Sequence, residues 1–226
     1  MSQYVLPAPP QASVAIAGSD VRFAVRRILC VGRNYAAHRR EMGGDERDPP
    51  FFFTKPADAV VAAGAAIPYP TATHDLQHEI ELVVALRAGG APSTTTEALN
   101  LIFGYAVGVD LTRRDLQNAA KAKGQPWDSG KAFDRSAPIS AIRPAQGPPP
   151  AGRIQISVNG QLRQNGMVAD MIWNVPEIII EAARLWDLAA GDLIFTGTPE
   201  GVGPLAPGDR VTGAIEGVGE LVFTIA

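Results

Sequence analysis

Glycine and proline limit the length of the helices and strands that this chain can form. Its 226 residues include 23 glycines and 19 prolines, which recur at short intervals. Glycines and prolines at such intervals favour many short strands over long helices. Apolar stretches, several alternating with a period of two, predict strands at 27–31, 51–54, 58–63, 79–86, 104–111, 153–158, 192–196, 209–215 and 220–225. We therefore expect a strand-rich α+β fold.

Local signals mark one hairpin and a few helices. Asn159-Gly160 lies between the segments 154–158 and 161–163 and predicts a two-residue hairpin turn, because both turn positions need a positive φ. Asn174 followed by Glu177 has the spacing of a capping box at the start of a helix. Residues 143–152, which hold four prolines, predict a surface loop. Helices are predicted near 35–42, 95–102, 112–122 and 175–188.

The overall composition argues against nucleic acid and membranes as binding partners. A hydrophobic content of 46% suits one large domain, and a net charge of −3 gives no general attraction for nucleic acid or an anionic membrane. Cys30 is the only cysteine, so no intramolecular disulfide can form, and its apolar neighbours predict a buried side chain. We find no secretory signal or membrane-spanning stretch, and expect a cytoplasmic protein.

Two acidic residues share one face of a predicted strand. Glu79 and Glu81 are two residues apart, which places both carboxylates on one side, about 7 Å apart. Val83 and Ala85 continue that face, so two unpaired charges there would be costly to desolvate, and a bound cation would remove the cost. An exposed strand end with two ordinary surface acids is an equal alternative on these residues alone.

A third carboxylate suggests what kind of ion could bind. Asp110 ends the apolar strand at 104–111, a common position for a ligand that faces a cleft, although it could instead cap the following helix. Three carboxylates without a cysteine cluster favour Mg²⁺ or Mn²⁺ over Ca²⁺, and disfavour zinc. Three protein oxygens leave coordination positions open for substrate and water.

Short motifs in a fixed order give the chain a specific resemblance. From about residue 27 to 226 it resembles the fumarylacetoacetate hydrolase family. The motifs are Cys30-Val31-Gly32-Arg33-Asn34-Tyr35 with His38 and Glu41, Phe53-Thr54-Lys55-Pro56, His78-Glu79-Ile80-Glu81-Leu82, Gly108-Val109-Asp110-Leu111-Thr112 with Arg114, Asp115 and Gln117, Gln125-Pro126-Trp127 through Lys131-Ala132-Phe133-Asp134, and Thr196-Gly197-Thr198-Pro199-Glu200-Gly201-Val202-Gly203.

The resemblance implies a fold, a metal and an activity. The fold would be a mixed β-sandwich roll with short flanking helices, with residues 27–226 as a single catalytic domain and 1–26 as an extension packed on it. The three acids would hold Mg²⁺ or Mn²⁺, with Ca²⁺ a substitute in a crystal, and the protein would be a homodimer. The expected activity, typical of the acylpyruvase branch, is cleavage of a carbon–carbon bond in a small diketo acid.

Within that branch the Phe51-Phe52-Phe53 run looks most like bacterial fumarylpyruvate hydrolases. These enzymes split 3-fumarylpyruvate into fumarate and pyruvate in gentisate breakdown. Alternatives that use the same metal are an oxaloacetate decarboxylase and a short-chain acylpyruvase. A further alternative is a non-catalytic β-sandwich with a structural Ca²⁺, which would fold with metal and turn over nothing.

His38 and Glu41 form the candidate water-activating pair. They are three residues apart on a predicted helix, so they share a face and can hydrogen-bond as a base and its orienting group. The resemblance places them on a lid, which the polar segment 43–50 also suits. An incidental pair on an exposed helix is the alternative.

The remaining candidates would bind the substrate. Three carboxylates and one divalent ion leave one negative charge, and an anionic substrate adds more, so further cations are needed. The resemblance assigns Lys131 to the keto or enolate oxygen and Arg114 with Gln117 to a carboxylate. Arg33 and Arg113 could reach the carboxylate of the acyl group, or be ordinary surface arginines. The turn at Gly197-Thr198 would offer an N–H and a hydroxyl, or be only a tight turn.

Overall fold

The computed structural model describes residues 5–35 and 48–226. His38, Glu41, the helix predicted near 35–42 and most of the predicted lid at 43–50 lie outside the described residues. No helix within the described ranges is long and apolar enough to cross a membrane.

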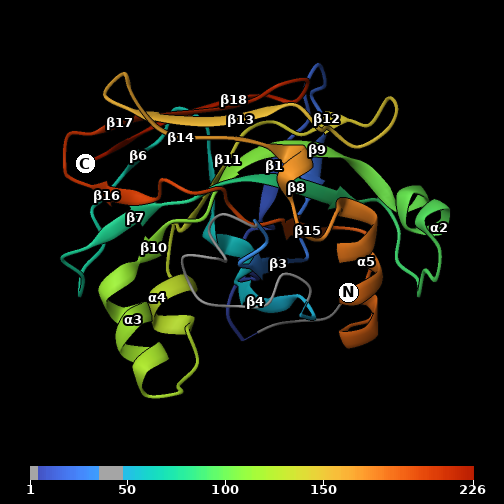
Figure 1. Ribbon diagram of the computed structural model, residues 1–226, viewed down its shortest axis with the longest axis horizontal. Helices are drawn as coiled ribbons and strands as arrows, with labels where there is room; N and C mark the ends of the chain where they lie inside the picture. The colour runs from blue at the N-terminus through green and yellow to red at the C-terminus, as the bar shows by residue number, and fades with distance from the viewer. Residues whose placement is uncertain (1–4, 36–47) are drawn as a thin grey trace.

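An eight-stranded mixed sheet forms the centre of the fold, and its order is β4-β3-β15-β8-β9-β11-β5, with β12 paired to β9 (Figure 1). Strands β15 and β3 are parallel, as are β11 and β5, while β8 and β9 are antiparallel. The strands are β3 (Arg27–Gly32), β4 (Phe51–Lys55), β5 (Val60–Ala62), β8 (Ile80–Leu86), β9 (Ile102–Val109), β11 (Ala137–Ile139), β12 (Arg143–Pro144) and β15 (Asp192–Phe195).

A second, five-stranded sheet lies over one face of the first, in the order β14-β13-β17-β18-β6 (Figure 1). Two smaller sheets complete the strands, one ordered β10-β7-β16 and one formed by β1 and β2. The bounds are β13 (Arg153–Val158), β14 (Gln161–Met167), β17 (Arg210–Ile215), β18 (Gly219–Ile225), β6 (Ala66–Ile67), β10 (Thr112–Arg113), β7 (Leu76–His78), β16 (Gly203–Leu205), β1 (Ser13–Ala15) and β2 (Arg22–Ala24).

Short helices flank the sheets. Helices α3 (Arg114–Ala122) and α4 (Asp128–Lys131) lie together at one end, and α2 (Thr95–Asn100) and α5 (Val175–Leu185) lie together at the other (Figure 1). Two 3-10 turns, η1 (Ala57–Ala59) and η2 (Val168–Asp170), complete the described elements. The strand-rich α+β fold is therefore confirmed.

Strand β8 is buried along its whole length because apolar layers cover both of its faces. Leu82 and Val84 join the core that packs against Ile154 and Phe223 of the five-stranded sheet. Val83 and Ala85 point to a second core, which Val14 and Phe23 of the β1–β2 hairpin help to cover. Period-two alternation thus divides β8 between two cores, and Glu81 lies on the second face with Val83. Cys30 is buried in this second core, as predicted.

Local signals in the sequence are largely confirmed. Asn159 and Gly160 have φ values of 52° and 77° and join β13 to β14. Asn174 accepts a hydrogen bond from the Glu177 N–H at 3.1 Å, and the Glu177 carboxylate accepts one from the Asn174 N–H at 3.0 Å, which completes the capping box.

Two predicted helices were wrong at one end, and several short strands were missed. The predicted helix 112–122 begins only at Arg114, because Thr112 and Arg113 pair with β7. The predicted helix 175–188 ends at Leu185, because Trp186 is extended and packs edge-on against Phe52. Residues 143–144 of the predicted loop form β12, and β1, β2, β6, β7, β11 and β16 were not predicted as strands. Strand β14 extends to Met167, beyond the 161–163 arm of the predicted hairpin.

Candidate active site

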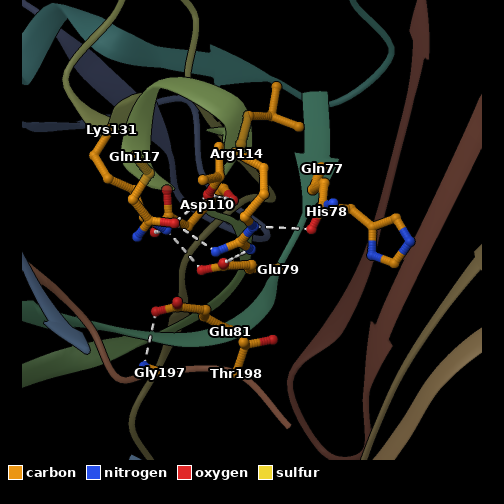
Figure 2. A network of polar contacts seen from close by, with 12 residues as sticks. Gln77, His78, Glu79, Glu81, Asp110, Arg114, Gln117, Lys131, Gly197 and Thr198 are labelled. Atoms are coloured by element: carbon orange, nitrogen blue, oxygen red, sulfur yellow. Dashed lines mark hydrogen bonds and ion pairs between the residues drawn. The ribbon is translucent and has the colours of Figure 1, made fainter. Parts of the chain in front are cut away.

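The pairing of β8 with β9 brings three carboxylates together. Glu81 lies opposite Gly108, and Ile80 lies opposite Val109, so Asp110 follows directly beside Glu79. The Asp110 N–H donates to the Glu79 carbonyl at 2.8 Å, which fixes this register. One oxygen from each of the three carboxylates lies within 4.8 Å of the others, and all three residues are buried. Figure 2 shows these carboxylates converging where β8 begins and β9 ends.

A buried lysine links two of these carboxylates. The Lys131 ammonium, at the end of α4, lies 2.7 Å from Glu79 Oε2 and 2.6 Å from Asp110 Oδ2. It also donates to the Thr112 hydroxyl at 2.6 Å. All three ammonium N–H groups are therefore engaged, and the Asp110 carboxylate faces a cation and does not cap the following helix.

Two more cations face Glu79 and Asp110. The Lys55 ammonium, on β4, lies 2.8 Å from Asp110 Oδ1 and donates to the carbonyls of Leu111, at 3.2 Å, and Lys131. Its approach to Oδ1 is an ion pair without well-directed hydrogen-bond geometry. The Arg114 guanidinium forms an ion pair with Glu79. Glu79 and Asp110 are thus neutralised by groups of the protein itself.

Glu81 has no such partner among the residues that the structure describes. Its Oε2 accepts a hydrogen bond from the Gly197 N–H at 2.8 Å, and no Lys or Arg nitrogen of the described residues forms an ion pair with it. Burial raises the pKa of Glu81 well above its usual range, and the negative charges of Asp110 and Glu79 raise it further. For Glu79, burial acts in the same direction, but Lys131 and Arg114 outweigh it and lower the pKa.

The donor set fits a hard divalent cation. Three carboxylates within reach of a single ion are the ligands that Mg²⁺ and Mn²⁺ prefer. Burial and the negative charges of Asp110 and Glu79 raise the pKa of Glu81, and a cation bound between the three carboxylates would offset both effects. Glu79, Glu81 and Asp110 would hold the ion.

A cavity of about 260 Å³ opens beside the carboxylates. Helix α3 forms one wall and presents four polar side chains at a spacing that keeps them on one face. Other lining residues come from the end of β3, from β4 and from the segment before α4. The cavity is lined by Val31, Gly32, Arg33, Phe53, Gln77, Glu79, Glu81, Arg114, Gln117, Asn118, Lys121, Trp127, Lys131, Thr198 and Val202.

Arg114 and Gln117 are brought together at the inner end of this wall. Arg114 Nε donates to the Gln77 side chain at 2.9 Å, and Nη1 donates to Gln117 Oε1 at 2.5 Å. With the contact to Glu79, three of the five guanidinium N–H groups are used. Two N–H groups of Arg114 remain available to another acceptor.

Arg33 and Lys121 are the cations of the cavity that have no ion-pair partner within the described parts of the chain. Arg33 follows β3 with φ +59°, a backbone conformation that non-glycine residues adopt rarely and that clusters at functional sites. Its buried Nε also has no hydrogen-bond partner among the residues at 5–35 and 48–226. Lys121 lies two turns along α3 from Arg114, at the outer end of the wall.

Arg113 does not reach the cavity. Its guanidinium lies over the Phe133 ring, 4.3 Å from the centroid, and it is not a lining residue. The sequence-based suggestion that Arg113 contacts the acyl carboxylate was therefore wrong, because the two-residue strand β10 directs it away. His78 is buried and points away from the carboxylates (Figure 2).

The 197–198 turn contributes two different groups. Gly197 has φ +94°, and a Cβ there would lie 2.8 Å from the Asn34 Cβ, so this position requires glycine. Its N–H is donated to Glu81 and so orients a carboxylate. Thr198 lines the cavity and is buried, and its hydroxyl accepts a hydrogen bond from Gln164 at 2.8 Å.

Sequence reasoning assigned no role to several of these residues. Lys55 stood in a recognised motif, but its contact with Asp110 depends on how β4 is placed, which no local pattern reveals. Lys121 could have been found from its spacing of seven residues from Arg114, which puts both on one helix face. Gln164 gave no signal, since it is a polar residue in an exposed-looking strand.

Comparisons with known proteins agree with this geometry. The family model described as fumarylacetoacetate (FAA) hydrolase C-terminal matches residues 27–226. A fumarylpyruvate hydrolase from a Ralstonia species is 44% identical over 77% of this chain and 92% of its own length. An oxaloacetate tautomerase, YcgM of Escherichia coli K12, is 39% identical over 88% of this chain and 93% of its own.

Solved structures are similar over the whole chain. The crystal structure of a fumarylpyruvate hydrolase from Pseudomonas aeruginosa, in complex with Mn²⁺ and pyruvate, is 48% identical and superposes with a TM-score of 0.95 over 99% of both chains. That of a putative fumarylpyruvate hydrolase from Burkholderia cenocepacia is 53% identical, with a TM-score of 0.93 over 100% of this chain and 96% of that one.

Proposed function

Because the chain belongs to the fumarylacetoacetate hydrolase family, we propose that it hydrolyses the carbon–carbon bond of 3-fumarylpyruvate and releases fumarate and pyruvate. Hydrolysis of such bonds is the activity named for its relatives from Ralstonia and Pseudomonas. The observation that carries the proposal is the cavity itself, which is lined by Glu79 and Glu81 of the three-carboxylate group and by two cations, Arg33 and Lys121, that form no ion pair within the described residues. We further propose that the enzyme is a homodimer that serves gentisate breakdown, as the resemblance implies.

The charges of the site favour a dianionic substrate. With Glu79, Glu81 and Asp110 all ionised, as metal binding requires, their three negative charges balance the three positive charges of Lys55, Lys131 and Arg114, so these six groups sum to zero. A divalent ion would bring the sum to +2. The two carboxylates of fumarylpyruvate would neutralise this excess, whereas acetylpyruvate, with one carboxylate, would leave half of it.

A bound Mg²⁺ or Mn²⁺ would act as a Lewis acid that withdraws charge from the 2-oxo group and the departing pyruvate unit. The protein supplies the other contacts. Arg114 has two free N–H groups beside the carboxylates and would hold the pyruvate carboxylate with the amide of Gln117. The Lys131 ammonium would share its N–H groups with the developing enolate oxygen.

The water-activating step is assigned to His38, oriented by Glu41, a pair that lies outside the described residues. In the proposal, His38 takes a proton from the water that attacks the acyl carbonyl, a contribution of about 10²–10⁴-fold to the rate. Arg33 and Lys121 would bind the distal carboxylate of the acyl group, because they line the cavity and form no ion pair with any residue that the structure describes.

The rival function with specific support is oxaloacetate tautomerisation. Relatives from Escherichia coli and mouse that carry this name are 39% and 40% identical over 88% of the chain. Oxaloacetate is also a dianion and would suit the same charge balance. It differs in having no acyl group that extends toward Lys121.

A substrate panel tests the proposal. Fumarylpyruvate, acetylpyruvate and oxaloacetate are each incubated with the enzyme and Mn²⁺ or Mg²⁺, and products are identified. We expect fumarate and pyruvate from fumarylpyruvate, no turnover after chelation, and weaker activity on acetylpyruvate. Oxaloacetate keto–enol exchange with no cleavage of fumarylpyruvate would establish the rival, and CO₂ release from oxaloacetate without cleavage would indicate a decarboxylase.

Matched lysine variants test substrate selection. Lys121→Met should lower kcat/KM for fumarylpyruvate about fivefold, the effect of losing a partly exposed charged hydrogen bond, and leave acetylpyruvate unaffected. Lys123→Met, on the same helix end but outside the cavity lining, is the control. Equal losses on both substrates would argue against a distal carboxylate contact.

A further inference from the structure

A buried glutamine connects the five-stranded sheet to the cavity. Gln164 lies in β14, is fully buried, and uses both ends of its amide. Its Oε1 accepts from the Ile80 N–H at 3.1 Å and lies 3.0 Å from His78 Nδ1. Its Nε2 donates to the Pro199 carbonyl at 2.7 Å and to the Thr198 hydroxyl at 2.8 Å.

Two backbone groups fix the orientation of this amide. The Ile80 N–H can only donate and the Pro199 carbonyl can only accept, so the oxygen of Gln164 must face Ile80 and its nitrogen must face Pro199. Flipping the amide would set donor against donor and acceptor against acceptor in a buried site. The nitrogen beside Thr198 is therefore a donor.

The amide orientation determines what the Thr198 hydroxyl can do. A hydroxyl that accepts from Gln164 must direct its own hydrogen elsewhere, and Thr198 lines the cavity. Within the described parts of the chain, the Thr198 hydroxyl donates a hydrogen bond to no protein acceptor. The amide also polarises the O–H bond and makes the hydroxyl a better donor.

Tight packing holds the two segments together. A Cβ on Gly166 would lie 2.8 Å from the Pro199 Cβ, and a Cβ on Gly201 would lie 2.3 Å from the Arg163 carbonyl oxygen. Only glycines allow β14 and the 198–201 segment to approach this closely. The Gln164 amide thus has one available position relative to Thr198.

We propose that Gln164 is a positioning residue that commits the Thr198 hydroxyl to donate a hydrogen bond to the substrate's pyruvate carboxylate or 2-oxo oxygen. The proposal rests on the proposed function, because it takes the ligand to be an acylpyruvate anion, whose oxygens only accept hydrogen bonds. Gln164 itself touches no substrate and acts through Thr198.

The decisive variant reverses the polarity of the amide. Gln164→Glu keeps the shape but places a carboxylate oxygen beside Thr198, so the hydroxyl would donate to this carboxylate and not to the ligand. We expect KM for fumarylpyruvate to rise about tenfold with a smaller change in kcat. Gln161→Glu, an exposed residue of the same strand, makes the same chemical change and should leave KM unaltered.

A double-mutant cycle separates positioning from general damage. Thr198→Val should raise KM about as much as Gln164→Glu, and the double variant should lose little more, because both changes remove one interaction. Thr198→Ser, which keeps the hydroxyl, should retain a KM close to that of the unaltered protein. Additive losses in the cycle, or equal KM values for Thr198→Ser and Thr198→Val, would overturn the proposal. If Gln164→Glu does not fold, the comparison of KM between Thr198→Ser and Thr198→Val still tests whether the hydroxyl binds the substrate.

Binding of pyruvate gives a readout that does not depend on turnover. Titration calorimetry in saturating Mn²⁺ should show pyruvate binding about tenfold weaker for Gln164→Glu and Thr198→Val, and unchanged for Gln161→Glu. If the unaltered protein binds pyruvate in this pattern but cleaves no acylpyruvate, the proposed function fails and the positioning role stands. Unchanged pyruvate affinity in all variants would refute the positioning role alone.

Discussion

Replacing Lys131 with methionine tests the electrostatics on which the site depends. The ammonium lies 2.7 Å from Glu79 and 2.6 Å from Asp110, with only 2% of its side chain exposed. Methionine has a similar length but no charge, so two buried carboxylates lose their shared cation while Lys55 and Arg114 remain. The change therefore isolates one charge.

The expected loss of stability can be estimated. Removing one partner of a buried ion pair costs about 3–5 kcal/mol. A carboxyl group can instead take up a proton, which for an ordinary glutamate at pH 7 costs about 3.7 kcal/mol. That second route limits the charge-related loss, so we expect about 3 kcal/mol, or roughly 6–12 °C in Tm for a domain of this size.

The loss should depend on pH and on metal. A carboxyl whose folded pKa is raised contributes less stability as pH rises, so the defect should shrink to about 1 kcal/mol at pH 5, where protonation is easy. Saturating Mn²⁺ supplies positive charge beside the same carboxylates and should raise the Tm of the variant more than that of the unaltered protein.

Thermal unfolding measured by circular dichroism, with chelator or with Mn²⁺, provides the assay. Lys123→Met, at the exposed end of α3, is the control and should be neutral. A metal-free Lys131→Met protein that melts within about 2 °C of the unaltered one at pH 7 would refute the ion-pair argument. Equal Mn²⁺ stabilisation of both proteins would show that the ion does not bind beside Lys131.

Two further predictions concern parts of the fold away from the carboxylates. Asn174→Ala removes the N-cap of α5 and should lower stability by about 1 kcal/mol without altering kcat/KM; an unchanged urea midpoint would contradict it. Burial tends to raise the pKa of Asp115, but hydrogen bonds from the Thr73 hydroxyl and the His74 N–H outweigh burial and lower it below 3.8. The stabilisation from Asp115 is therefore present above pH 3.8 and lost as pH falls through the folded pKa. Asp115→Asn should cost more stability at pH 7 than at pH 3 in urea unfolding, and a pH-independent difference would count against this explanation.

Signals that involve neighbouring residues predicted their structures well. The turn at Asn159-Gly160 and the capping box of Asn174 and Glu177 form as expected, because each depends on contacts within four residues. Each of the nine predicted strands overlaps an observed one, although residues 57–59 form a 3-10 turn before β5. Predictions failed where a contact with a distant part of the chain overrides a local preference. Thr112 and Arg113, for example, pair with β7 and so are not part of the predicted helix.

The candidate site was predictable in its chemistry but less so in its contacts. The alternation of Glu79 and Glu81 suggested a cation, and the structure groups them with Asp110. It also gives Gly197 a different partner from the one expected, the Glu81 carboxylate, and directs Arg113 onto the Phe133 ring. Such contacts depend on the placement of side chains from separate elements, which no spacing in the sequence specifies.

The amino-acid sequence by itself determined which segments become strands, where the hairpin turns, where α5 begins, and which acidic side chains share a strand face. Those features follow from backbone preferences and periodicity over a few residues. Only the tertiary structure decided that Asp110 stands beside Glu79, that Lys55 comes from β4 to reach Asp110, and that Gln164 comes from β14 to hold Thr198. These contacts join residues 31 to 55 positions apart, and their geometry follows from strand register and core packing, which are set by the whole chain at once.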